Sequence, residues 1–293
     1  MDIVTKINQS NEFEVLSGIS DLALEKNYFI IDLWGVLHDG QAAYPNALDC
    51  LEKLAEADKQ IILLSNAPRR AFKAEEVLEK LGFTHDLYSK VITSGELAFE
   101  AVENERELNN YYYIGPEKDR DILDGLSKHE VTTPHEADFA IATGFEGFGS
   151  VFEEKKGQLD ESLDADLPLI CANPDRKVVK QNGETQICAG LMGEYYEQNG
   201  GEVIYFGKPF GLAYEACFDF FGNPHKDEIC CIGDSLHTDI AGGNIAEIDS
   251  ILCAGGIHKE ELLEGKGINL NNLTSLIEKE GSSPDYVVPE FKW

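Results

Sequence analysis

The sequence predicts an α/β protein with a parallel sheet in its core domain and a second α/β domain inserted between the two halves of that core. A chain of 293 residues is longer than one average domain, which favours two domains. Short apolar runs alternate with amphipathic helical segments, and this alternation is typical of parallel sheets. Polar residues follow the apolar runs near both ends of the chain but not in its middle third, which indicates a discontinuous core.

The first third of the chain predicts a βαβ unit. A helix is expected around residues 11–24, where apolar side chains recur every three residues, and a buried strand is expected at 28–33. A helix is expected with Pro45 as its first residue, and it leads to a second buried strand at 60–64. Pro68 is expected to open a further helix.

The middle third has apolar runs of its own, with strands expected at 111–114, 139–142 and 167–172. The pattern of the first third then resumes, with strands expected at 203–206, 228–232 and 250–253. We therefore assign residues 1–100 and 201–293 to one discontinuous core domain, and residues 101–200 to an inserted α/β domain.

Acidic residues dominate the charge of the chain. It has 54 Asp and Glu against 24 Lys and Arg, a formal net charge of -30, which disfavours a role with nucleic acid or anionic membranes. No apolar stretch is as long as a membrane span, and the N-terminal residues lack the apolar run of a signal peptide, so a cytoplasmic location is expected. The seven cysteines form no CxxC pair and are expected to be reduced core residues.

Polar residues stand at or just beyond the ends of the expected core strands: Asp32, Ser65, Lys208, Asp234 and Asp239. Each alone has an ordinary structural explanation, as a turn residue, a helix cap or a solvated lysine. Their common position at strand ends is harder to explain in this way, because open α/β sheets bind ligands at the carboxyl ends of their strands. We therefore expect these residues to meet in one site.

These residue types suit the transfer of a phosphoryl group. Carboxylates gathered at strand ends can hold a hard cation such as Mg²⁺, and Asp32 and Asp234 are expected to do so. Ser65 and the start of the helix after it can hydrogen-bond phosphate oxygens, while Lys208 balances the negative charge. Attack by Asp32 would give an aspartyl-phosphate, which water then hydrolyses.

Six segments follow one another along the chain: DLWGVLHDG, LLSNAPRR, TSGE, ANPD, GKP and GDSLHTDIAGG. In this order they resemble the motifs of the haloacid dehalogenase superfamily, in particular its class IIA or NagD-like branch. That branch includes nitrophenylphosphatase-like and pyridoxal-phosphate phosphatases. The resemblance covers nearly the whole chain. It implies a core with a Rossmann-like, doubly wound parallel sheet, a C2-type α/β cap between the second and third motifs, and Mg²⁺ as the cofactor.

The resemblance also implies a role for each residue of the site. The expected set comprises the catalytic residues Asp32, Ser65 and Lys208; the phosphate-binding residues Ser65, Asn66 and Lys208; the metal ligands Asp32, Asp234 and the main-chain carbonyl of Trp34; Asp239 and Ser235 just outside these ligands; and Asn173 and Asp175 of the cap. The implied partner is a small phosphorylated metabolite, such as a sugar phosphate, a nucleotide or pyridoxal phosphate. The sequence leaves open whether the protein forms a homodimer.

Trp34 departs from the family's usual pattern. Phosphatases of the family usually carry a second aspartate there, as general acid and base, and such a group contributes about 10² to 10⁴-fold in rate.

A phosphatase is the leading hypothesis, and two alternatives stand beside it. One is a dehalogenase-like or phosphonatase-like hydrolase, and the other is a weakly active protein that binds a phosphorylated ligand. His38 and Asp39 are nearby in the sequence, but similar pairs occur in members of the family that retain the aspartate. We therefore do not assume that this pair replaces the missing acid and base.

Overall fold

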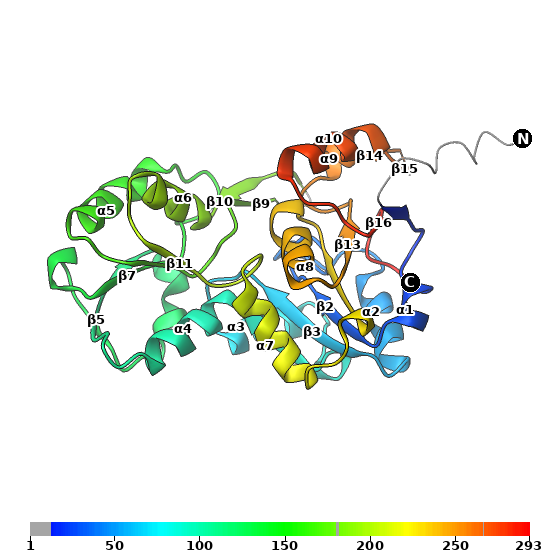
Figure 1. Cartoon of the computed structure of the whole chain (residues 1–293), viewed down its shortest axis with the longest axis horizontal. Helices are drawn as coiled ribbons and strands as arrows, with labels where there is room; N and C mark the ends of the chain where they lie inside the picture. The colour runs from blue at the N-terminus through cyan, green and yellow to red at the C-terminus, as the bar shows by residue number, and fades with distance from the viewer. Residues whose placement is uncertain (1–12, 180–181, 266) are drawn as a thin grey trace, which may run out of the picture.

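The computed structural model describes residues 13–179, 182–265 and 267–293. Two parallel sheets form two lobes that lie side by side (Figure 1). The larger sheet has seven strands, in the order β1 (Glu14–Val15), β16 (Tyr286–Val288), β13 (Asp249–Cys253), β12 (Ile229–Gly233), β2 (Tyr28–Ile31), β3 (Gln60–Ser65) and β4 (Lys90–Thr93). The expected α/β class with a doubly wound parallel sheet is therefore confirmed.

Helices cover both faces of this sheet because its strands are apolar on both sides. The helical elements of this lobe are α1 (Leu22–Glu25), α2 (Ala47–Glu56), α3 (Ala71–Lys80), η2 (His85–Leu87), α7 (Gly211–Phe221), η5 (Lys226–Glu228), η6 (Leu236–Ile240), α8 (Ala241–Ala246), α9 (Lys259–Leu262) and α10 (Leu270–Glu280). Phe29 and Ile31 of β2 pack in one core cluster, with α1, α2 and α3, whereas Ile30 packs in another, with α7 and α8.

The smaller sheet has five strands, in the order β11 (Val203–Tyr205), β8 (Leu169–Cys171), β7 (Phe139–Ala142), β5 (Asn110–Ile114) and β6 (His129–Glu130). Its helical elements are α4 (Ser94–Asn104), η3 (Glu117–Leu123), η4 (Pro134–Glu136), α5 (Glu153–Asp164) and α6 (Gly190–Gln198). Helices α5 and α6 pack against one face, and α4 and η3 against the other. This lobe therefore has a core of its own.

Two short antiparallel pairs lie outside these sheets. The first pair, β9 (Lys177–Val179) and β10 (Thr185–Ile187), forms a hairpin of the smaller lobe that extends toward the larger one (Figure 1). The second pair, β14 (Leu263–Glu264) and β15 (Gly267–Ile268), precedes α10. The hairpin β9–β10 is the one that bears on the site.

The helix expected around residues 11–24 is wrong. The structure has the strand β1 at Glu14–Val15 and a helix only at Leu22–Glu25, while residues 11 and 12 lie outside the described part of the chain. Strand β1 pairs with β16, from the other end of the chain. This long-range pairing, which a local pattern cannot reveal, outweighs the helical spacing of the apolar side chains.

The strand expected at 203–206 forms, but in the other sheet. Strand β11 (Val203–Tyr205) pairs with β8 of the smaller sheet, so it does not resume the large sheet as expected. The strands expected at 228–232 and 250–253 do belong to the large sheet, as β12 and β13. The division into a core of 1–100 and 201–293 and a cap of 101–200 stays a prediction, and β11 favours moving its second boundary beyond residue 205.

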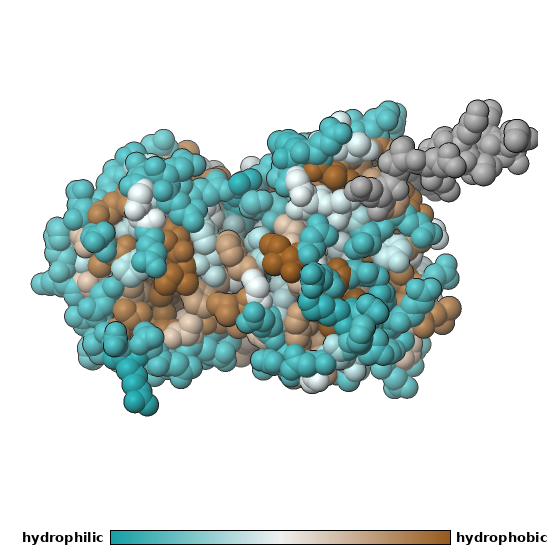
Figure 2. Space-filling model, viewed as in Figure 1, coloured by the Kyte–Doolittle hydropathy of each residue, from teal (hydrophilic) through white to brown (hydrophobic). Residues whose placement is uncertain are grey.

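Burial and surface follow the composition of the chain. The seven cysteines are free and buried, as expected of reduced core residues. Hydrophilic side chains cover much of the face that Figure 2 shows. Among the described helices, none has the length and apolar character needed to cross a membrane.

We expect the smaller lobe to be removable if β11 leaves with it. Excision of residues 101–200 keeps Val203–Tyr205 but removes β8, so β11 would be left as an unpaired strand that promotes aggregation. Excision of residues 101–205 should therefore give the more soluble protein, with a cooperative thermal transition by circular dichroism. A shorter excision product that is equally soluble and cooperative would contradict this boundary.

Candidate active site

Asp32 and Asp234 follow two adjacent parallel strands. Ile31 of β2 is paired in register with Ile232 of β12, so Asp32 comes one residue after this pair and Asp234 two residues after it. The backbone N–H of Asp32 donates to the carbonyl of Ile232 at 2.9 Å. Ser65 ends β3, on the other side of β2. The carboxyl edge of the large sheet thus gathers three of the expected residues.

The ammonium group of Lys208 joins two acids of this site. Its Nζ atom donates to Oδ1 of Asp32 at 2.5 Å and to Oδ1 of Asp239 at 2.7 Å, and all three side chains are buried. The second oxygen of Asp239, which lies in η6, accepts the backbone N–H of Ser235 at 3.2 Å. Lys208 therefore lies directly against the expected nucleophile.

Burial leaves the site with an excess of negative charge. It raises the pKa of Asp32 to about 8, with Lys208 opposing this shift and Asp239 adding to it. Burial, followed by the nearby Asp32 and Asp239, also raises the pKa of Asp234 well above its usual range. Burial alone would lower the pKa of Lys208, but the charges of Asp239 and Asp32 outweigh it and raise that pKa. One ammonium thus faces three buried carboxylates, and a further cation would stabilise their ionised forms.

The donor set of the site fits Mg²⁺. Asp32, Asp234 and Asp239 each offer a carboxylate oxygen, and these oxygens lie within 4.8 Å of one another. The main-chain carbonyl of Trp34 accepts no backbone hydrogen bond from the residues that the structure describes. Oxygen ligands without nitrogen or sulfur are those that Mg²⁺ prefers. Asp239 was expected just outside the ligands, yet it lies as close as the other two acids.

The turn after β2 passes directly against Asp234. Gly35 has a φ of +85°, and a Cβ atom at this position would lie 1.8 Å from Oδ2 of Asp234. The same Oδ2 accepts the backbone N–H of Ile257 at 2.6 Å. Only glycine allows both this backbone conformation and this close approach.

Asn66 connects the large lobe to the smaller lobe, which we call the cap from here on. Its Oδ1 accepts the backbone N–H of Lys208 at 2.7 Å, and its Nδ2 donates to the carbonyl of Lys208 and to Oδ1 of Asp175, both at 2.9 Å. These bonds occupy the polar atoms of the Asn66 side chain, so its side chain has no donor left for a phosphate. The Ser65 hydroxyl accepts the backbone N–H of Ala67 at 3.2 Å and keeps its own proton to donate.

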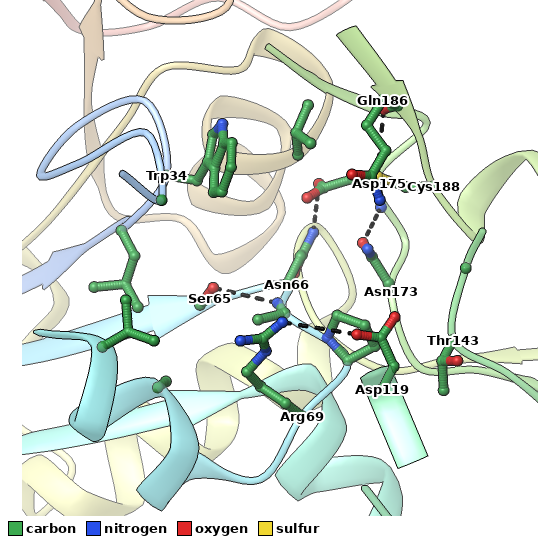
Figure 3. Close-up of a pocket in the computed structure, with 18 of the residues that line it drawn as sticks. Trp34, Ser65, Asn66, Arg69, Asp119, Thr143, Asn173, Asp175, Gln186 and Cys188 are labelled. Carbon is green, nitrogen blue, oxygen red and sulfur yellow. Dashed lines mark hydrogen bonds and ion pairs between the residues drawn. The ribbon is translucent and has the colours of Figure 1, made fainter. Parts of the chain in front are cut away.

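Asn173 and Asp175, the two expected cap residues, both reach the site. They follow β8, and the backbone N–H of Asp175 donates to Oδ1 of Asn173 at 3.1 Å. Figure 3 shows the carboxyl group of Asp175 pointing from the cap toward Asn66 and Trp34. Burial raises the pKa of Asp175 to about 6, although Lys208 and the bond from Asn66 lower it.

Trp34 ties the turn after β2 to the cap hairpin. Its indole Nε1–H donates to the carbonyl of Val179, in β9, at 3.0 Å. The indole therefore forms a contact between the two lobes. It does not offer the carboxyl group that phosphatases of the resembled family usually have at this position.

The two polar residues that follow Trp34 in the turn are also engaged. Burial lowers the pKa of His38 to about 4, so its ring is neutral at neutral pH, and its Nδ1 accepts the N–H of Gly40 at 2.9 Å. Oδ1 of Asp39 accepts the N–H groups of Gln41 and Ala42, at 3.0 and 2.8 Å. Both side chains therefore shape the turn itself.

A cavity of about 360 Å³ lies beside these residues, between the large lobe and the cap. Trp34, Ser65, Asn66 and Asp175 are among the residues that line both this outer cavity and a second, inner cavity of about 130 Å³. The inner cavity also contains Asp32, Lys208, Asp234 and Asp239. The residues shared by the two cavities mark the place where a reacting group and the rest of its molecule would meet.

The outer cavity has charged residues that the sequence did not single out. Asp119 of η3 faces Arg69 across the cavity, with 3.7 Å between Oδ1 and the guanidinium nitrogen (Figure 3). Lys118 lines the same space. By contrast Arg70, which follows Arg69 in the sequence, is held by two bonds to Glu96, both at 2.9 Å. Asp119 and Lys118 belong to no motif, so only the fold brings them to the site.

Two family models match the chain. The model of the haloacid dehalogenase-like hydrolases matches residues 29–127, and a second model of that hydrolase type matches residues 205–292. This chain belongs to the haloacid dehalogenase superfamily.

Individual relatives agree with this assignment to the haloacid dehalogenase hydrolases and point to the class IIA, NagD-like branch. The chain is 25% identical to the sugar-phosphatase AraL of Bacillus subtilis, over 79% of this chain and 84% of that protein. It is 24% identical to the ribonucleotide monophosphatase NagD of Escherichia coli, over 78% and 87%. A haloacid dehalogenase-like hydrolase from Brucella suis has a similar structure, with a TM-score of 0.80, 26% identity, and coverage of 94% of this chain and 99% of that one.

We expect Gly35→Ala to weaken Mg²⁺ binding at least about tenfold, because the new methyl group displaces the carboxylate of Asp234 as well as straining the turn. Isothermal titration calorimetry with MgCl₂ would measure the affinity. Gly125→Ala is a matched control, since Gly125 has a similar φ of +83° but nothing within 4 Å of an added Cβ. Equal affinities in the two variants would show that Asp234 is not a ligand.

Proposed function

We propose that the protein is a Mg²⁺-dependent phosphatase that hydrolyses a small phosphorylated metabolite through an aspartyl-phosphate on Asp32. The observation that carries this proposal is the contact of Lys208 with Asp32, beside Asp234 and at the inner end of a two-part cavity. A nucleophilic carboxylate, a buried cation and an acidic metal site are the groups that phosphoryl transfer requires.

Each residue has a defined part in this reaction. The Oδ atom of Asp32 attacks the phosphorus while Lys208 balances the charge of the nucleophile and of the phosphoryl oxygens. The Ser65 hydroxyl donates to one of these oxygens. When bound, Mg²⁺ would be held by Asp32, Asp234 and the carbonyl of Trp34, and would neutralise charge on the phosphoryl group as it is transferred. Asp239 fixes the position of the Lys208 ammonium.

The relatives support the class of reaction. The names of the AraL and NagD proteins describe phosphatases of a sugar phosphate and of ribonucleotides, and that of another similar structure, from Archaeoglobus fulgidus, describes a p-nitrophenyl phosphatase. The volume of the outer cavity suits a small molecule. Trp34 keeps a dehalogenase-like or phosphonatase-like reaction as the alternative. A dehalogenase would release halide, whereas a phosphonatase would release phosphate from a phosphonate and not from a phosphate ester.

Asp32→Asn should abolish turnover, because an amide oxygen cannot form the acyl-phosphate bond. The measurement is phosphate release from p-nitrophenyl phosphate with Mg²⁺, together with acid-stable labelling of the protein by ³²P. The wild-type protein should be labelled on Asp32 and the variant should not. Normal phosphate release by the variant would refute the proposed nucleophile.

Lys208→Met should lower kcat by about 10² to 10³-fold, because it removes one charge that stabilises the transferring group. Lys26→Met is a matched control: Lys26 is also a buried lysine paired with an acid, Asp249, at 2.5 Å, but it lies outside both cavities. The control should lose stability in a thermal melt and keep its kcat below the melting temperature. If the two variants lose the same factor in kcat, Lys208 acts only through stability.

A further inference from the structure

The site of this hydrolase lacks a proton donor at the usual position. An alcohol leaving group needs a proton as its bond to phosphorus breaks, and a positioned acid supplies it in efficient enzymes. The indole of Trp34 is not an acid, and its only N–H is already bonded to Val179. Another group at the junction of the two cavities would have to supply the proton.

Asp175 lies at that junction. It is among the residues that line both the inner cavity, with Asp32 and Lys208, and the outer one, where the rest of a substrate would lie. The bond from Asn66 occupies its Oδ1, whereas its Oδ2 accepts no hydrogen bond from the described residues. The carboxyl group is thus fixed by one oxygen, and the other is available to a ligand (Figure 3).

Resting on the proposed phosphatase function, we propose that Asp175 of the cap is the general acid and base of this enzyme, in place of the aspartate that Trp34 replaces. Asp175 and Asn66 meet only because the cap contacts the large lobe. The acid is therefore supplied by the cap, while the nucleophile is supplied by the large sheet.

The surroundings of Asp175 suit this role. Burial raises its pKa to about 6, closer to neutral than that of an exposed aspartate, and Asp239 adds to the shift while Lys208 and Asn66 oppose it. The electrostatic influence also reaches the nucleophile, because the charge of Asp175 contributes to the raised pKa of Asp32. A bound phosphate dianion would favour the protonated form further.

The proposed steps balance in protons and electron pairs. An Asp32 oxygen forms a bond to phosphorus, the bond from phosphorus to the leaving oxygen breaks, and that oxygen takes the proton of Asp175. In the second step the Asp175 carboxylate takes a proton from water as the water oxygen attacks phosphorus. The bond from phosphorus to Asp32 then breaks, which restores the Asp32 carboxylate, and Asp175 is again protonated.

Two other groups near the cavities serve this role less well. The pKa of His38 is lowered to about 4, so at neutral pH its ring lacks the extra proton that an imidazolium acid would donate. Asp119 has a raised pKa of about 6 from burial, but it lines only the outer cavity and faces Arg69. Asp119 thus has a raised pKa like that of Asp175 but does not line the inner cavity, which makes it a matched control.

The test uses the full chain with Mg²⁺ and a series of aryl phosphates, from p-nitrophenyl to unsubstituted phenyl phosphate. In Asp175→Asn, kcat/KM for phenyl phosphate should fall about 10² to 10⁴-fold, and that for p-nitrophenyl phosphate less than about tenfold, because nitrophenolate leaves without a proton. The loss of the base should also slow the second step, so p-nitrophenyl phosphate should give a burst of nitrophenol and a ³²P-labelled protein. Asn retains the oxygen that accepts from Asn66.

The outcomes separate the two proposals. If the wild-type protein releases no phosphate from any of these esters, the phosphatase function is wrong, and the role of Asp175 with it. If the wild-type protein is active and Asp175→Asn lowers kcat/KM equally for all esters, or for none, only the role of Asp175 is wrong. A selective loss in Asp119→Asn would assign the acid to Asp119. Restored hydrolysis of phenyl phosphate in Trp34→Asp/Asp175→Asn would show that the two positions supply the same proton.

Discussion

The site depends on one buried ammonium group. Lys208 touches both Asp32 and Asp239, and without it two carboxylates would face each other in a space that water scarcely reaches. A buried charge that loses its partner destabilises the folded protein, so the position of the Lys208 backbone matters for stability. Asn66 bonds both the N–H and the carbonyl of Lys208, so the end of β3 fixes the position of the lysine backbone.

The same asparagine links this charge to the cap. Because Nδ2 of Asn66 also donates to Asp175, one side chain sets the positions of the lysine and of the cap carboxyl group. The hydrogen bond from Trp34 to Val179 adds a second link to the same segment of the cap. The contact between the lobes and the position of Lys208 thus depend on one side chain, and a substitution that loosens Asn66 would affect both.

The sequence revealed the residues that follow buried strands, and it missed what depends on contacts across the fold. Asp32 and Asp234 could be found because each ends an apolar run, and parallel strands deliver such residues to one edge. The bond between Asn66 and Asp175 spans 109 residues and leaves no local pattern. The local pattern predicts a helix where the short strand β1 lies, since two residues are too few to show a period and their partner is β16. It also predicts β11 in the large sheet, because the pairing of β11 with β8 leaves no local pattern.

The order of strands in the large sheet has a consequence for synthesis of the chain. Strand β2, which precedes Asp32, lies between β3, made soon afterwards, and β12, made only after the whole smaller lobe. Until the ribosome has released β12, one edge of β2 has no partner, and Asp32 lacks Asp234 beside it. Pairings of such long range form slowly and leave a strand edge open to other chains. The smaller lobe, whose strands all precede β12 in the chain, is synthesised in full before this edge is closed.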